Sequence, residues 1–242
     1  MDIGKALGYV FEDEEWLTKL LLGAVLFLIP IFGWFVVMGY AIAVTRNLMA
    51  GESHPLPAWQ DIGRFFMDGL MFWVVMMIYS IPLFIVLCPM AVVWILPALG
   101  GEEEDLVAIL AGVSGLVSLG LGCLGGLYGI LMSLLTPVLQ VRYAETGEIG
   151  ACLRFGEIFQ FLFSDIGNIV ISQVVVWLAS IVVGLVVSTA ATILAVIPIC
   201  GWILGGALGL LMLPFSVWLM VFSAHLYGQI GHRAGIHALE AQ

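Results

Sequence analysis

Four long stretches of the chain are strongly apolar and contain no formally charged residue. They hold 26, 33, 36 and 67 residues and lie between Lys19 and Arg46, Asp68 and Glu102, Asp105 and Arg142, and Asp165 and Arg233. A helix needs roughly 20 apolar residues to cross the hydrocarbon core of a bilayer. The second and third stretches therefore predict one membrane span each, and the last stretch predicts two.

A six-residue pattern interrupts the first and last stretches. It reads IPIFGW at residues 29–34 and IPICGW at residues 197–202. Proline removes a helical hydrogen-bond donor and glycine permits a tight reversal, so the pattern predicts the turn of a helical hairpin. The last stretch is too long for a single span and requires such a turn. Residues 20–45 leave two alternatives open, one tilted span or two short half-helices.

Shorter similarities divide the chain into three units. Phe-x-Asp occurs at residues 11–13, 66–68 and 163–165, each time before an apolar run, and LGGLYGILM at 124–132 matches LGGALGLLM at 204–212. We expect a single membrane domain over residues 1–242, built from three helical-hairpin repeats at approximately 8–50, 54–147 and 148–235. The predicted fold is an all-α, polytopic membrane helix bundle with about six membrane segments, the first pair short.

The positive charges favour one orientation of these hairpins. With three hairpins, all seven basic residues fall on one side of the membrane, and the other side receives only the acidic turn at 102–105. Cytoplasmic loops carry an excess of lysine and arginine, so both termini are expected to be cytoplasmic.

Composition supports a membrane setting and excludes several function classes. The chain is 62% hydrophobic and only 10% charged, with a mean hydropathy of +1.16, which no soluble domain of 242 residues could bury. The net charge of −10 argues against nucleic acid as a partner. The spans lack Asp, Glu, Lys and Arg, whereas pumps and proton-coupled carriers keep such groups inside the bundle.

The segments between the apolar stretches predict amphipathic helices on the cytoplasmic surface. In residues 54–69 and 148–165, apolar side chains recur at helical spacing opposite charged ones. The first segment also carries Trp59, Phe65 and Phe66, and aromatic residues dominate protein interfaces. These three residues are candidates for docking a protein partner, with simple membrane anchoring as the alternative.

These segments carry a family resemblance. PLPAWQDIGRFFMDGL at 55–70, YAETGEIGACLRFGEIF at 143–159 and HLYGQIG at 225–231 resemble the prokaryotic membrane proteins grouped as domain of unknown function 4013. The resemblance implies an integral protein of a prokaryotic plasma membrane. It implies no reaction, and it transfers no catalytic or binding residue.

No pattern in the chain predicts catalysis, a cofactor or a metal site. The four cysteines are scattered, and the histidines lack paired-ligand spacing. Glycines at four-residue spacing are the clearest positive signal, because small residues let helix backbones approach closely in lipid. We expect helix packing within the bundle at Gly122, Gly126, Gly201, Gly205 and Gly209, with an interface between copies of the chain as the alternative.

The sequence favours a non-enzymatic integral membrane protein, a scaffold or accessory subunit that binds membrane lipids and protein partners, as a homo-oligomer or within a membrane complex. A transporter or channel for a neutral or lipidic solute is the alternative, because many transporters contain internal repeats.

Overall fold

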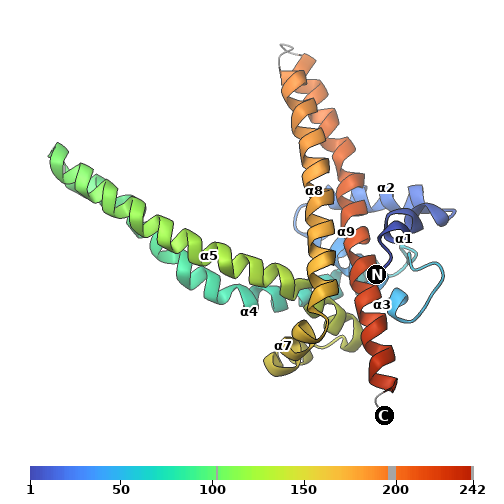
Figure 1. The fold of residues 1–242 in the computed structure, drawn as a ribbon. Helices are drawn as coiled ribbons and strands as arrows, with labels where there is room; N and C mark the ends of the chain where they lie inside the picture. Colours follow the sequence, from blue (N-terminus) through green and yellow to red (C-terminus); the bar gives the residue numbers. More distant parts are fainter. Residues whose placement is uncertain (102, 196–199, 241–242) are drawn as a thin grey trace. The chain divides into compact units, whose positions relative to one another are not determined.

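The structure, a computed structural model, describes residues 1–101, 103–195 and 200–240. All regular elements in this part of the chain are helices. The α-helices are α1 (Ile3–Gly8), α2 (Trp16–Phe27), α3 (Phe32–Met49), α4 (Ile62–Ile95), α5 (Glu104–Thr146), α6 (Ile149–Cys152), α7 (Phe155–Ser164), α8 (Ile166–Ala195) and α9 (Cys200–Glu240), and two short 3₁₀-helices are η1 (Tyr9–Glu12) and η2 (Leu96–Gly100). Figure 1 shows the helices in chain order.

The described chain forms two compact units. The first contains Met1–Val74 and Pro137–Gln242, and the second contains Val75–Thr136. The division falls inside α4 and α5 and does not follow the three repeats expected at 8–50, 54–147 and 148–235. Those repeat boundaries, and a single domain over residues 1–242, remain predictions.

Residues 20–45 form two helices rather than one span. Helix α2 ends at Phe27 and α3 begins at Phe32, and between them Ile31 adopts a positive φ of 67°. A Cβ atom at Gly33 would overlap the carbonyl group of Leu26, so only glycine allows this return of the chain. The IPIFGW pattern therefore marks a turn between two helices, as its proline and glycine predicted, while the membrane hairpin expected there remains a prediction.

The crossing of α3 and α4 in the first unit is unusually close. A Cβ atom at Gly39 would overlap the backbone carbonyl of Phe65, and one at Gly69 would overlap the carbonyl of Phe35. Both helices therefore present the same Phe-x-x-x-Gly spacing to each other. Neither side chain could be added without separating the two backbones.

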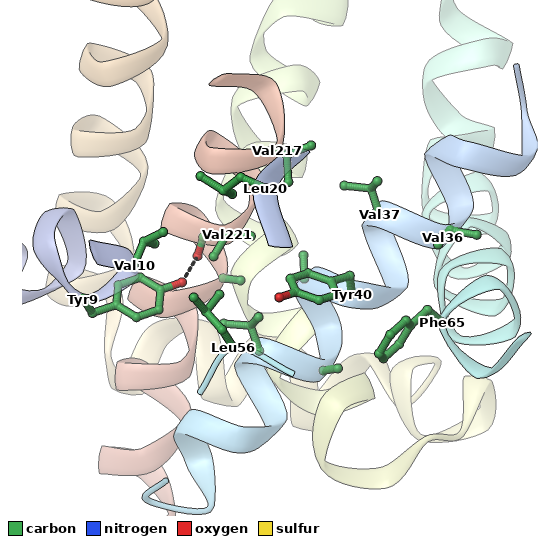
Figure 2. Packing of buried hydrophobic residues seen from close by; sticks show 14 residues of the cluster. Tyr9, Val10, Leu20, Val36, Val37, Tyr40, Leu56, Phe65, Val217 and Val221 are labelled. Atoms are coloured by element: carbon green, nitrogen blue, oxygen red, sulfur yellow. Dashed lines mark hydrogen bonds between the residues drawn. The ribbon is translucent and has the colours of Figure 1, made fainter. Parts of the chain in front are cut away.

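Helix α3 is the central helix of the first unit, as 61% of its most apolar stretch is buried in the protein. Figure 2 shows Val37 and Tyr40 of α3 beside Leu20 of α2 and Val217 and Val221 of α9. The linker after α3 and the start of α4 complete the cluster with Leu56 and Phe65. The N-terminal part of the chain, residues 9–65, thus shares one core with α9, which lies far away in the sequence.

Helices α8 and α9 pack side by side in opposite directions in the first unit (Figure 1). The amide of Gln173 in α8 donates a hydrogen bond to the Tyr227 hydroxyl in α9 over 3.1 Å, and both side chains are buried. Gln173 and Tyr227 lie at similar distances before and after residue 200, as expected if the chain turns there. The IPICGW turn at 197–202 lies largely outside the described residues.

The second unit is an antiparallel hairpin of the paired parts of α4 and α5. Tyr128 donates its hydroxyl hydrogen to the carbonyl of Tyr79 over 2.6 Å, and Ser114 donates to the carbonyl of Val93 over 2.9 Å. The later residue of α5, Tyr128, meets the earlier residue of α4, Tyr79, so the two helices run in opposite directions. The expected acidic turn lies at the junction, where Gly101 has a φ of 60°.

In the described part of the chain, five helices are long and apolar enough to cross a membrane: α3, α4, α5, α8 and α9. The chain is therefore an all-α protein with the character of a multi-pass membrane protein. Helix α2 has only 12 residues, about 18 Å at 1.5 Å per residue, and is too short to cross a hydrocarbon core of about 30 Å. The expectation of about six segments thus becomes five candidate spans and one short apolar helix.

Candidate functional site

The linker between α3 and α4 is fixed to the core by side-chain contacts. The Trp59 ring stacks on Tyr40 with a centroid distance of 4.1 Å and an interplanar angle of 11°. The Trp59 indole N–H donates to the Lys19 carbonyl over 3.0 Å, and the Tyr40 hydroxyl donates to the Pro57 carbonyl over 3.0 Å. The two prolines and Trp59 of this segment thus belong to an ordered connection between α2, α3 and α4.

The other two aromatic residues expected to dock a partner also pack inside the chain. Phe65 is only 5% exposed and meets Tyr40 edge to face at 5.6 Å. Phe66 stacks on Phe32 at 5.0 Å. Docking of another protein on Trp59, Phe65 and Phe66 remains a prediction, but the buried Phe65 ring has almost no surface to offer a partner.

The first two Phe-x-Asp positions form ion pairs within the chain. Asp13 accepts a hydrogen bond from the Lys19 ammonium over 2.6 Å, and Asp68 accepts one from Arg46 over 3.2 Å. Desolvation opposes ionisation of Asp13, yet the hydrogen bonds from Lys19 and from the Glu15 N–H lower the pKa of its carboxyl below the usual value. These two aspartates therefore stabilise the start of α2 and the α3–α4 crossing.

The third Phe-x-Asp position differs from the first two. One oxygen of Asp165 accepts a hydrogen bond from the Asn168 amide over 2.6 Å, and no cation of the described chain pairs with this carboxylate. A cavity of about 400 Å³ opens beside it, at the junction of α7, α8 and α9. The cavity is lined by Phe161, Ser164, Asp165, Asn168, Arg233 and Ala234.

A buried polar contact that the sequence analysis did not identify joins three helices. Gln140 of α5 donates to the Thr45 hydroxyl of α3 over 2.9 Å. The Thr45 hydroxyl lies 3.1 Å from the Ala41 carbonyl and 3.2 Å from the Ala224 carbonyl of α9. A buried hydrogen bond of this kind fixes the rotation of each helix, because an unpaired polar group in this environment would be costly. Isolated Thr and Gln residues in an apolar run were the available signal.

The N-terminal segment is held against α9 around His225, which is 1% exposed. The ring of Tyr9 lies 4.1 Å from the His225 ring, and the Tyr9 hydroxyl donates to the Val221 carbonyl over 3.0 Å, the bond drawn in Figure 2. Gln229 binds both the backbone N–H and the carbonyl of Asp2, at 2.7 and 2.9 Å. Burial raises the pKa of the Tyr9 hydroxyl well above its usual value, so the group stays a neutral donor.

Four of the five predicted packing glycines have no close neighbour among the described residues of their own unit. A Cβ atom built at Gly122, Gly126, Gly205 or Gly209 would have no neighbouring atom within 4 Å. The packing environment of Gly201 lies outside the described residues. Four-residue spacing thus identified helix faces that no described helix of the same unit covers. The alternative, an interface between copies, remains a prediction for these faces.

The close helix contacts use other glycines, which lie where two backbones cross. Besides Gly39 and Gly69, Gly228 lies against Leu48, and Gly231 lies against Met49 and Val141. Gly39 and Gly69 each stand alone in the sequence without a second glycine four residues away. The spacing rule therefore could not have found them.

An apolar pocket lies between η1, α2 and α9. It encloses about 440 Å³, and its walls are Phe11, Trp16, Leu17, Leu20, Leu21, Pro214, Phe215 and Trp218. This volume is within the range of about 300–1,000 Å³ that is usual for small-molecule sites. Apart from the indole N–H groups of Trp16 and Trp218, the walls carry only apolar side-chain atoms, which favours an apolar ligand or the apolar part of one.

The described residues contain no group of three or more His, Cys, Asp or Glu side chains that could hold a metal ion. The buried Cys152 thiol lies 3.8 Å from the Leu139 carbonyl, and burial raises its pKa to about 11. At neutral pH this thiol is protonated and unsuited to nucleophilic chemistry.

Comparison with known proteins places the chain in a family but gives it no activity. No curated protein and no solved structure matches the chain. The profile of a family described as "Protein of unknown function (DUF4013)" matches residues 22–196, which include all of helices α3 to α8. With well over half of its length matched and five helices suited to a membrane, this chain belongs to the DUF4013 family of unknown function.

Proposed function

We propose that this protein is a non-enzymatic membrane scaffold or accessory subunit, which binds lipid and holds a partner helix against an uncovered face of α5. One observation carries the proposal. Only 6% of the most apolar stretch of α5 is buried in the protein, compared with 61% for α3. Helix α5 therefore contributes far more apolar surface than the fold of this chain uses.

The uncovered face of α5 is rich in glycine. Gly122 and Gly126 are four residues apart and face open space, while Gly125 lies on the packed side, where its Cβ would come within 3.2 Å of Leu87 in α4. Lipid tails are as apolar as leucine, so helices associate in a membrane through close van der Waals packing. A glycine face left open in one chain favours contact with a second membrane helix.

A pair of variants separates contacts between chains from contacts within the chain. The double substitution Gly122→Leu and Gly126→Leu should abolish a co-purifying partner or a self-association, while the thermal stability of the isolated chain stays within about 2 °C of the wild type, because no described atom lies near either site. The control Gly125→Leu should lower stability, because its side chain would meet Leu83 and Leu87.

The measurement is purification in mild detergent, followed by native mass spectrometry of the intact assembly. The scaffold is supported if the wild type carries a stoichiometric second chain and the double variant loses it. The Gly125→Leu control should retain the second chain, or lose it only to the extent that the protein itself is less stable. A wild-type chain that is monomeric and free of partners in every mild detergent contradicts it.

A second candidate function is binding or transport of a neutral or lipidic solute. The pocket of about 440 Å³ between η1, α2 and α9 favours this function, because its walls are formed by apolar and aromatic side chains. Helix α2 beside the pocket is too short to cross the membrane. Leu21→Trp, at an exposed residue of the pocket wall, should displace an apolar ligand that co-purifies with the wild type. The same ligand content in both proteins would contradict this function.

A further inference from the structure

The third Phe-x-Asp position differs from the first two, because no cation of the described residues pairs with its carboxylate. Asp13 and Asp68 are neutralised by Lys19 and Arg46. Asp165 binds Asn168 through Oδ1, and its Oδ2 makes no hydrogen bond to any described residue. Asp165 is partly exposed and directly precedes α8, so its carboxylate is accessible to a cationic group from outside the chain.

A cation that could have neutralised Asp165 lines the same cavity and has no ion-pair partner among the described side chains. Arg233 of α9 lines the cavity of about 400 Å³ with Asp165 and Asn168. Its guanidinium makes no ion pair and no hydrogen bond with the described residues, and it does not reach Asp165. Two opposite charges thus face one cavity and leave a gap between them.

We propose that this cavity binds the headgroup of a zwitterionic phospholipid with a primary amine, the phosphoethanolamine class, with Arg233 on the phosphate and Asp165 on the ammonium. The planar guanidinium fits a phosphate diester, because it can donate two parallel hydrogen bonds to two of its oxygens. The free Oδ2 of Asp165 accepts a hydrogen bond from the ammonium group. The Ser164 hydroxyl and the Asn168 side chain supply further polar atoms at the wall.

The position of the cavity along the helices suits a headgroup rather than an acyl chain. Asp165 directly precedes α8, and Arg233 lies at the end of the apolar stretch Gly205–Ala234 of α9. The two candidate spans pack in opposite directions, so these ends lie together at one membrane surface. Helix α7 adjoins the cavity with Ile158 and Leu162 buried and Phe155 and Phe163 exposed, as expected for a helix lying in the headgroup region.

The charges of the cavity also discriminate among headgroups. An anionic headgroup without an amine would satisfy Arg233 through its phosphate but would supply no cation to Asp165. A choline headgroup carries the positive charge but has no N–H to donate to the carboxylate. A primary ammonium satisfies both groups, and the cavity therefore selects phosphoethanolamine lipids over both alternatives.

The inference deepens the lipid-binding part of the proposed function and does not depend on a partner helix. The test is native mass spectrometry of the full chain in detergent, titrated with phosphoethanolamine, phosphocholine and phosphoglycerol lipids that share identical acyl chains. We expect the wild type to bind the phosphoethanolamine lipid about tenfold more tightly than the other two, the size of one charge-assisted hydrogen bond.

Four variants complete the experiment. Arg233→Gln should weaken all three lipids, and Arg233→Lys, which keeps the charge but loses the planar fork, should fall between it and the wild type. Asp165→Asn should remove only the preference for the amine. Arg154→Gln is the control, because Arg154 is an exposed cation of the same surface that is already paired with Glu157 and does not line the cavity.

The outcomes separate the two ideas. Lipid binding without headgroup preference, or equal losses in Arg233→Gln and Arg154→Gln, overturns the inference and leaves the scaffold standing. Absence of bound lipid in the wild type overturns the inference together with the lipid-binding part of the proposed function. If Arg233→Gln does not fold, the folded Arg233→Lys and Asp165→Asn proteins decide the matter by the amine preference.

Discussion

Replacing Gly39 by alanine tests the closest contact of the fold. A Cβ atom there would overlap the carbonyl of Phe65 in α4. The neighbouring atom belongs to a backbone and cannot rotate away, so the two helices must separate. Separation would also loosen the contact of Phe65 with Tyr40, whose rings are 5.6 Å apart.

The expected magnitude combines two opposing effects. Overpacking a tight contact costs about 1–3 kcal/mol, and an immovable neighbour places this case near 3 kcal/mol. Alanine regains about 1 kcal/mol of helix propensity relative to glycine. The net loss is about 2 kcal/mol, which for a chain of this size corresponds to a fall in Tm of about 4–8 °C.

The control is Gly63→Ala at the start of α4, where no atom lies within 4 Å of a Cβ. This variant gains the helix propensity of alanine without a steric overlap, so its Tm should be unchanged or slightly higher than that of the wild type. The difference between the two variants therefore measures the steric effect alone. The assay is thermal unfolding in one detergent, followed by far-UV circular dichroism and by the size-exclusion profile.

The reciprocal contact gives an internal check. Gly69→Ala should resemble Gly39→Ala, since its Cβ would overlap the carbonyl of Phe35. Once one alanine has separated the helices, the second costs less, so the double variant should lose less than the sum. A Gly39→Ala protein with a Tm equal to that of Gly63→Ala would refute the close crossing.

The remaining predictions address the linker, pH, a thiol and the topology. Trp59→Ala should lower the free energy of unfolding by about 3 kcal/mol, because it removes the stack on Tyr40 and the hydrogen bond to the Lys19 carbonyl. Trp94→Ala, at a side chain that is 73% exposed, should change this free energy little in detergent, and equal effects of the two variants would contradict the packed linker. The lowered pKa of Asp13 contributes stability that is complete above about pH 4 and is lost as pH falls through the pKa of the folded state. The dependence of stability on acid pH should therefore be less steep in Asp13→Asn than in the wild type. Identical curves of stability against pH would exclude a role for the Asp13–Lys19 pair. Cys152, buried and with its pKa raised to about 11, should resist maleimide in the folded protein and react in denaturing detergent; rapid labelling of the native chain would contradict its burial. With the native cysteines replaced, Ser53→Cys should be labelled from the cytoplasmic side and Glu103→Cys from the outside, both residues being exposed, and the reverse pattern would overturn the proposed orientation with both termini cytoplasmic.

The length of the apolar runs determines much of the fold. Runs of 33 and 36 uncharged residues correspond to α4 and α5, and the run of 67 corresponds to α8 and α9. Helix location follows from the local chain, because a long apolar segment in lipid must satisfy its own backbone hydrogen bonds. The proline and glycine of IPIFGW likewise placed the first turn, although only the structure decided between one span and two helices.

Side-chain roles depended on contacts between distant segments and could not be read from spacing. The glycines at four-residue intervals, Gly122 and Gly126, are uncovered, while the solitary Gly39 and Gly69 make the tight crossing. Trp59 belongs to the core because Tyr40 and Lys19 lie beneath it. The three Phe-x-Asp positions are alike in sequence, and they differ only in the side chains that lie beside each aspartate in the folded chain.

The sequence by itself determined that this chain is helical and built for a membrane, since both properties follow from the composition and length of local segments. The tertiary structure alone decided which polar and small residues are satisfied within the chain. Asp13 and Asp68 meet Lys19 and Arg46, whereas Asp165 and Arg233 face the same cavity without meeting. The physical reason is that a charge or a glycine acquires its role from the atoms folded against it, and those atoms come from helices far away in the sequence.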